Sequence, residues 1–224
     1  CAEAIRELIK ELKLDLKVSV VLGDDLMTEK SKFLELNTKE MYSNEDFPAE
    51  DKIASINAYL GAFPIAEALK SGADIVITGR SVDSAVTLGA CIYSFGWNEK
   101  EYDKLAAGSL AGHIIECGTQ STGGNFTDWE LVSKDLHQIG YPIVEVSEDG
   151  SFDCTKSKNS TGMVSFGTVA EQMLYEIDDP QAYILPDVIC DFSNVKIEET
   201  DKDKVKITGA VSYTHLTLPT IYSV

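Results

Sequence analysis

Long hydrophobic runs are missing from this sequence, and so is any excess of positive charge. No apolar run approaches the roughly 20 residues that cross a bilayer, and no secretory signal peptide opens the chain. We therefore expect no membrane partner. The chain carries 19 basic against 37 acidic residues, which gives a formal net charge of −18. Because such a field repels polyanions, we also expect no nucleic-acid partner.

Cysteine pairs at metal-binding or redox spacing are also absent. The five cysteines are scattered without a CxxC motif, and there are only three histidines. A disulfide framework is typical of much shorter, secreted chains. We therefore expect reduced thiols and a cytoplasmic protein.

What is present is a pattern of alternating helices and buried strands. Apolar residues at helical spacing in Ala2–Leu14 precede the apolar run Leu16–Leu22. A second helix is predicted over Asn57–Ser71, with the short strand Ile75–Thr78 and another helix from Ser84 to about Tyr93 after it. This order predicts an α/β fold with a mostly parallel sheet flanked by helices, in Rossmann-like layers.

The predicted secondary structure changes after Trp129, where the sequence indicates a more β-rich C-terminal portion. The segments Ile143–Val146, Val195–Glu199 and Val205–Thr208 read as strands, and the last two flank a charged hairpin turn. We expect an α/β core over 1–128 and a continuation of the same domain over 129–210. A further helix is predicted over Tyr102–Cys117.

Both ends of the chain are expected to be artificial. Cys1 already lies inside a helical pattern, so we expect natural sequence before it. Back-translation of Val211–Thr220 gives the bases of a transposase adapter used to prepare DNA libraries, and the adapter continues to a stop after Val224. The alternative is a natural strand, since Thr, Tyr and Leu favour strands. We interpret 211–224 as a non-native tail, which removes His215 from the candidate residues.

The first candidate site follows the strand Ile75–Thr78. Ligands of open α/β sheets bind beyond the carboxyl ends of the strands. There Gly79 allows close backbone approach, and Arg80 offers a planar fork for a carboxylate or phosphate. Asp83 is a candidate for catalysis, with helix capping and pairing to Arg80 as the alternative. Asn57 is expected to line the same crevice.

The second candidate is the loop that contains Thr122, Gly123, Gly124 and Asn125. Paired glycines flanked by polar residues can expose successive backbone N–H groups as an anion-binding nest. The alternative is an ordinary loop that ends a helix. No Gly-Lys-Ser/Thr follows the glycines, so the loop is not a Walker motif.

The third candidate is a polar face on the predicted helix Tyr102–Cys117. His113, Glu116 and Cys117 are three and four residues apart and therefore share one face. His113 or Glu116 could move a proton during catalysis. A zinc site is the alternative, but no nearby histidine or cysteine completes four ligands, and we predict no metal. The sequence identifies no cofactor.

Several long blocks together resemble the acyclic terpene utilisation (AtuA) family. They read NAYLGAFPIAEALKSGADIVITGRSVDSA, FGW, KLAAGSLAGHIIECGTQSTGGNFTDW and GTVAEQMLYEIDDPQAYILPDV. The resemblance covers about Cys1 to Ala210 and implies an internal fragment of the N-terminal AtuA domain. It departs from the family where Ser81-Val82 replaces the usual Val-Ala, while Arg80 and Asp83 are retained.

The resemblance implies a bacterial-type cytoplasmic protein that takes part in the catabolism of acyclic terpenoids or related branched acids. We expect lyase or hydratase chemistry on a branched carboxylic acid or its CoA thioester. Arg80 would hold the carboxylate, and the glycine loop would bind an oxygen. The alternatives are a non-catalytic binding or assembly subunit and a metal-dependent enzyme. Its partner would be the small acid or acyl-CoA, with a homo-oligomer or a pathway subunit also possible.

Overall fold

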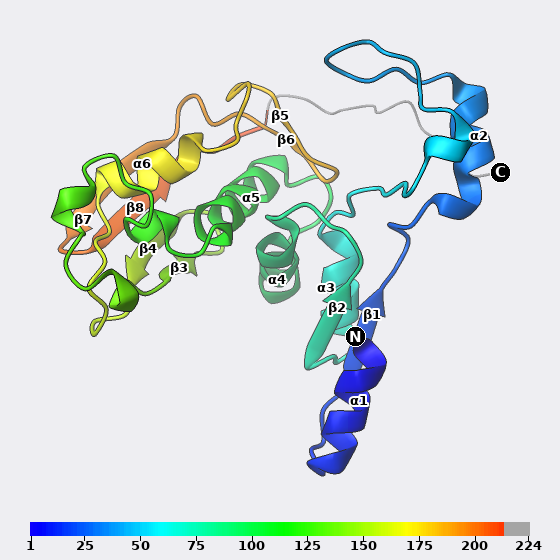
Figure 1. The fold of residues 1–224 in the computed structure, drawn as a ribbon. Coiled ribbons are helices and arrows are strands. Elements are labelled where there is room, and N and C mark those ends of the chain that lie inside the picture. The colour runs from blue at the N-terminus through cyan, green and yellow to red at the C-terminus, as the bar shows by residue number, and fades with distance from the viewer. Residues whose placement is uncertain (213–224) are drawn as a thin grey trace.

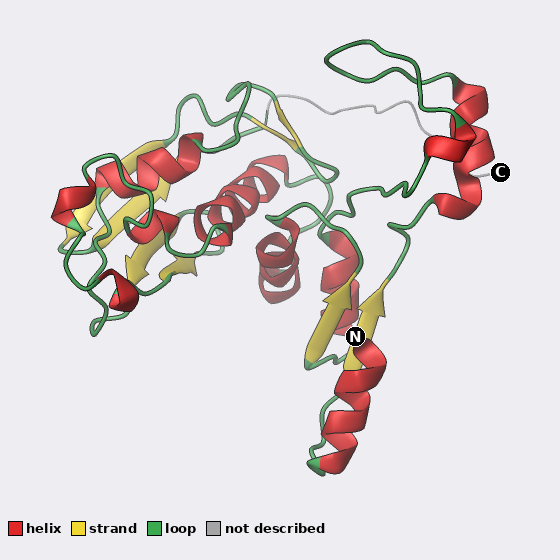
Figure 2. Cartoon of the chain, in the orientation of Figure 1, coloured by secondary structure: helices red, strands yellow, loops and turns green. Residues whose placement is uncertain are grey.

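The computed structural model describes residues 1–212 and forms a mixed α/β structure (Figures 1 and 2). The helices are α1 (Ala2–Glu11), α2 (Lys30–Leu36), α3 (Phe63–Lys70), α4 (Ala85–Phe95), α5 (Tyr102–Glu116) and α6 (Phe166–Leu174). The strands are β1 (Val18–Val21), β2 (Ile75–Thr78), β3 (Pro142–Val146), β4 (Phe152–Lys156), β5 (Tyr183–Ile184), β6 (Ile189–Cys190), β7 (Lys196–Asp201) and β8 (Lys204–Thr208). The predicted tail lies outside the described residues from position 213 onward, and so does His215.

Strands β1 and β2 form a parallel pair joined through α3. Val18 pairs with Ile75 and Val21 with Thr78, so both strands end at the same edge of the sheet. The chain leaves β1 toward Asp24 and leaves β2 directly into Gly79 and Arg80. The parallel pairing thus brings two polar segments together that are far apart in the sequence.

The expected mostly parallel sheet is not what the described residues form. A four-stranded antiparallel sheet in the order β3-β4-β8-β7 and an antiparallel β5–β6 pair make up the rest of the strand structure. Tight turns join β3 to β4 and β7 to β8, and hairpins of this kind pair antiparallel, whereas parallel pairs need long crossovers. The C-terminal part is rich in strands, but these strands do not extend the β1–β2 sheet.

Helix α3 begins six residues later than the predicted Asn57 because its first turn is specified locally. Pro64 occupies the first turn, where its missing N–H costs nothing. The Asp187 carboxylate accepts a hydrogen bond from the Ala62 backbone N–H at 2.8 Å. Gly61 lies directly against this carboxylate, where a side chain would collide with it. The residues before α3 form no helix, and Leu60 bridges to Ser81 in parallel.

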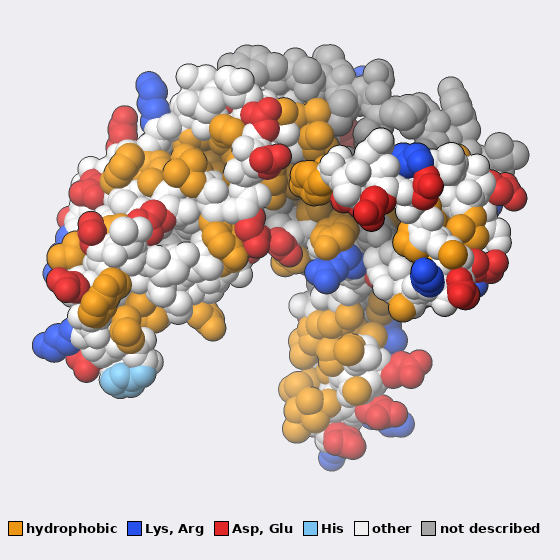
Figure 3. All heavy atoms as spheres, turned by 45° about the horizontal axis from the view of Figure 1, so that its top comes forward, with side chains coloured by type: hydrophobic (Ala, Val, Ile, Leu, Met, Phe, Trp, Pro, Cys, Tyr) orange, Lys and Arg blue, Asp and Glu red, His pale blue; other side chains and the backbone are white. Residues whose placement is uncertain are grey.

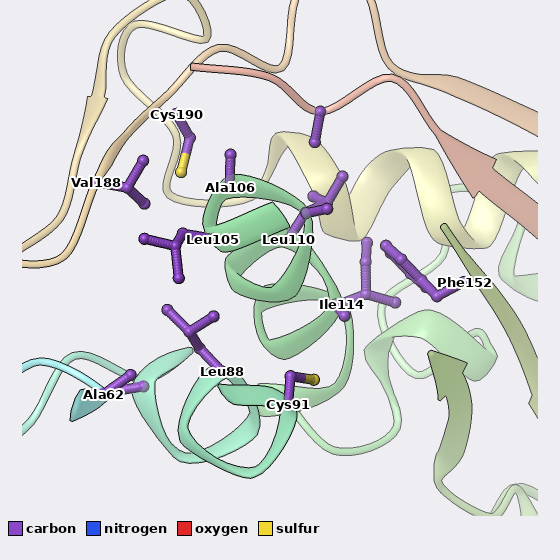
Figure 4. Packing of buried hydrophobic residues seen from close by; sticks show 14 of the residues in the cluster. Ala62, Leu88, Cys91, Leu105, Ala106, Leu110, Ile114, Phe152, Val188 and Cys190 are labelled. Atoms are coloured by element: carbon purple, nitrogen blue, oxygen red, sulfur yellow. The ribbon is translucent and has the colours of Figure 1, made fainter. Parts of the chain in front are cut away.

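Helix α5 forms the centre of the core (Figure 4). Ten of its fifteen residues are buried, so it is covered on every side, as expected for an interior helix. Gly112 packs against the backbone of Ser84, just before α4, and Gly108 packs against Leu88 and Trp97. These contacts hold α4 and α5 close together and position the C-terminal end of α5.

The N-terminal arm of the chain leaves apolar surface exposed. No residue of α1 is buried, and Leu8 and Leu12 are each more than half exposed. Figure 3 shows hydrophobic side chains gathered on the arm that α1 forms with β1 and β2. Within residues 1–212, no helix has the length and apolar content that a membrane span requires.

Candidate functional site

An open cleft of about 710 Å³ lies beside the carboxyl end of β2. It is bordered by the β2–α4 loop, the C-terminal end of α5 and the residues just after α6. The side chains that matter for its chemistry are those of Arg80, Asp83, Val86, Glu116, Cys117 and Glu176. The volume falls in the range of roughly 300–1,000 Å³ that is usual for small-molecule sites. Two of the three predicted regions therefore meet in one hollow.

The backbone of Arg80 is held by Asp24 from the end of β1. The Asp24 carboxylate accepts hydrogen bonds from the Arg80 backbone N–H at 2.8 Å and from the Asn57 amide at 3.2 Å. The bond from the Arg80 N–H contributes most to a lowering of the Asp24 pKa. Gly79 leaves room for this carboxylate, because a β-carbon at Gly79 would overlap it. Asn57 therefore supports the loop through Asp24 and is not among the residues that line the cleft.

The Arg80 side chain is exposed and, among residues 1–212, has no acidic partner. Its guanidinium lies 5.2 Å from the centroid of the Tyr59 ring, a cation–π contact. In the described part of the chain, no carboxylate lies within ion-pair distance of this guanidinium. The alternative that Arg80 only pairs with Asp83 does not match this geometry. The planar donor fork remains open to an anion from solution.

Asp83 lines the cleft and does not cap α4. The residue before that helix is Ser84, and its side chain makes no capping hydrogen bond. Asp83 is exposed and lies one helical turn before Val86, which also borders the cleft and is 58% exposed. A carboxylate and an apolar side chain thus stand next to each other on this wall.

Glu116 brings the end of α5 into the cleft, while His113 lies behind it. His113 is buried, and its Nδ1 is 3.2 Å from the Glu116 carboxylate. A hydrogen bond from this Nδ1–H to the carboxylate fixes the orientation of the Glu116 side chain. Nε2 of His113 has no hydrogen-bond partner among the described residues. The polar face predicted on this helix therefore divides into one residue that reaches the cleft and one that supports it.

Three further residues complete the surroundings, and sequence reasoning did not identify them. Tyr175 and Glu176, just after α6, border the cleft. Tyr183 on β5 packs on His113, with ring centroids 6.1 Å apart. Burial raises the pKa of Tyr183 to about 12, and the negative charges of Glu116, Asp83 and Glu176 add to the rise. These residues follow no motif: Tyr175 and Glu176 reach the cleft through tertiary packing, and Tyr183 lies behind it against His113.

Cys117 lines the cleft, but its surroundings do not favour a thiolate. Burial is the main cause of a raised Cys117 pKa, and the nearby Glu116 and Glu176 charges raise it further. A thiol activated for nucleophilic attack needs the opposite shift. Among the described residues, no three His, Cys, Asp or Glu side chains are grouped so that they could hold a metal ion. His113, Glu116 and Cys117 therefore do not form the zinc site considered as an alternative.

The glycine loop after α5 lies apart from the cleft. The N–H groups of Gly123 and Gly124 donate to the carbonyls of Gln120 and Thr119. Thr122 is buried, and its hydroxyl donates at 2.7 Å to the Gly140 carbonyl. The nest geometry expected here is absent because both amides are already used within a turn. Thr122, Gly123, Gly124 and Asn125 are also not among the residues that line the cleft.

A family model described as acyclic terpene utilisation family protein AtuA matches residues 1–217. Neither the curated proteins nor the solved structures contain a match.

Proposed function

This chain belongs to the acyclic terpene utilisation family AtuA, and from this premise we propose that it is a catabolic enzyme with lyase or hydratase chemistry. Membership of the family suggests a role in the use of acyclic terpenes. The proposed substrate is a branched carboxylic acid or its CoA thioester. The proposed site is the cleft beside β2.

One observation carries the proposal: a guanidinium with no ion pair among residues 1–212 borders the same cleft as three carboxylates, those of Asp83, Glu116 and Glu176. Arg80 would hold a carboxylate or carbonyl oxygen of the substrate through charge-assisted hydrogen bonds. Glu116 and Asp83 would then act on the atoms next to that group. Val86 supplies apolar surface for a branched chain.

The chemistry needs one base and one acid. In the dehydration direction, a carboxylate removes a proton from the carbon beside the substrate's carboxyl or thioester group. The electron pair left behind forms a double bond as the neighbouring hydroxyl leaves. The second group donates a proton to that hydroxyl, so the products are an unsaturated acid and water. Hydration is the same reaction reversed.

We assign the two proton transfers to Glu116 and Asp83. The Glu116 side chain is 12% exposed and its carboxylate lies 3.2 Å from the His113 Nδ1, whereas Asp83 is exposed; both residues border the cleft. His113 does not line the cleft, so it serves as a positioning residue for Glu116.

The test is turnover in heavy water. The purified protein would be incubated with branched hydroxy acids, branched unsaturated acids and their CoA thioesters, and the products weighed by mass spectrometry. Hydration or α-proton exchange should add deuterium, and Glu116→Gln should slow this by about 10²–10⁴-fold. Glu198→Gln, on the exposed β7 strand, is the matched control and should leave the rate unchanged. Equal rates in Glu116→Gln and the unmodified protein would contradict the assignment.

A second reading is a binding or assembly subunit without catalysis. The observation that favours it is that His113 lies in the core, so that only Glu116 of the pair reaches the cleft. Such a subunit would bind the acid or thioester with the same dependence on Arg80. It would incorporate no deuterium with any substrate in the panel. The heavy-water experiment therefore separates the two readings.

A further inference from the structure

Charge is distributed unequally around the cleft. Among the described residues that line it, Arg80 is the one cation, and Asp83, Glu116 and Glu176 are three acids. From this imbalance we propose that the natural ligand is a compact branched acid with a single negative charge, and that its CoA thioester is excluded. This inference rests on the function proposed above and narrows its substrate class.

The unpaired state of Arg80 shows where one anion can bind. Although three acids border the cleft, the guanidinium lies over Tyr59 and forms no ion pair within the described residues. Asp24 holds the Arg80 backbone and leaves the side-chain donors free. A single carboxylate can accept two parallel hydrogen bonds from this fork.

The three acids act against a more highly charged ligand. CoA carries a diphosphate and a further phosphate, and a thioester gives up the carboxylate that Arg80 would bind. The negative charges of Glu116, Asp83 and Glu176 reach as far as the Tyr183 hydroxyl, so they share one region of the molecule. The formal net charge of −18 over the whole chain adds a long-range repulsion of polyanions.

The apolar walls suit the rest of a small branched acid. Val86 on α4 is 58% exposed and Tyr175 is 36% exposed, and both border the cleft. Covering these side chains with a short branched hydrocarbon removes apolar surface from water on both partners. The carboxylate would then lie at Arg80 with the chain directed along Val86.

The experiment measures binding of isovalerate, isovaleryl-CoA and free CoA by titration calorimetry. Isovalerate should bind at least about tenfold more tightly than isovaleryl-CoA, since charge-assisted hydrogen bonds are the stronger class. Arg80→Ala should weaken isovalerate binding by about tenfold or more. Glu176→Gln should improve binding of the thioester more than that of the acid. Lys100→Ala, which removes an exposed cation outside the cleft, is the matched control and should change neither.

Two results would overturn the inference in different ways. In the first, isovaleryl-CoA binds as tightly as isovalerate and Arg80→Ala weakens the binding of both. The thioester is then a ligand, so the inference that it is excluded is wrong while the proposed function stands. If neither compound binds, or if Arg80→Ala changes nothing, the proposed function fails together with the inference. If isovalerate binds more tightly than isovaleryl-CoA, and this preference is lost in Arg80→Ala but kept in Lys100→Ala, the result supports both the proposed function and the inference.

Discussion

At the scale of single residues, Asp24 and Gly79 prepare the position of Arg80. Asp24 ends the segment after β1, and Gly79 begins the loop after β2. The Asp24 carboxylate occupies the space that a side chain at position 79 would need. From that place it accepts the Arg80 backbone N–H at 2.8 Å. The position of Arg80 thus depends on a carboxylate from the segment that follows β1.

Gly79→Ala should therefore disturb Asp24 and, through it, Arg80. We expect a loss of about 1–3 kcal/mol in the free energy of unfolding, the usual cost of forcing extra volume into a packed place. The control is the same substitution in an Asp24→Ala background, where the obstructing carboxylate is absent. There the added methyl should cost less than half as much, because contacting residues are not additive. Urea denaturation of the four proteins measures this, and equal costs in both backgrounds would contradict the account.

At the scale of elements, the packing of α4 against α5 places both walls of the cleft. Arg80 and Asp83 precede α4, while Glu116 ends α5, so any shift between the helices changes the distance across the cleft. Gly112 allows the close approach, since a β-carbon there would lie 2.7 Å from the Ser84 Cα and carbonyl oxygen. Gly108 makes a similar contact, but with the side chains of Leu88 and Trp97.

Gly112→Ala and Gly108→Ala form a matched pair of tests. Alanine is a better helix former than glycine by about 1 kcal/mol, which favours both variants equally. Only Gly112→Ala must move backbone, whereas the side chains beside Gly108 can adjust. We expect Gly112→Ala to lower the free energy of unfolding by about 1–3 kcal/mol and Gly108→Ala to cost less. Thermal unfolding would measure the order, and a larger loss in Gly108→Ala would show that backbone contact is not decisive.

Elements with a local signal were predictable from the sequence. The strand Ile75–Thr78 has the predicted bounds, and α5 differs from its prediction by one residue. The start of α3 was predicted wrongly because the Asp187 cap comes from a distant hairpin. The predicted parallel sheet was larger than the observed β1–β2 pair for a related reason. The local sequence pattern does not say which strands pair with each other.

In the candidate site, too, residues with a local sequence signal were predictable and residues placed by distant contacts were not. Arg80 and Asp83 were predictable because the strand-end rule places them at a sheet edge. Tyr175 and Glu176, which border the cleft, were not predictable, and neither were Asp24 and Tyr183, which contact Arg80 and His113, because tertiary contacts without a motif bring them there. The glycine loop had a suggestive composition, but sequence could not show that its amides bind carbonyls of the same turn.

At the scale of the whole molecule, three distant segments of the chain meet at one hollow. They comprise residues 79–86, 116–117 and 175–176. The glycine loop at 122–125 and the hollow bordered by Phe63 and Lys100 lie elsewhere. A ligand in the cleft must therefore affect all three segments together and leave the other two regions unchanged.

The most direct test of the cleft as the ligand site is hydrogen–deuterium exchange by mass spectrometry, with and without saturating isovalerate. We predict slower exchange in peptides that cover 79–86, 114–118 and 174–177, and unchanged exchange at 122–125. Arg80→Ala should abolish this protection at the same ligand concentration. Protection confined to the glycine loop or to the region of Phe63 and Lys100 would contradict the account, as would protection in Arg80→Ala equal to that of the unmodified protein.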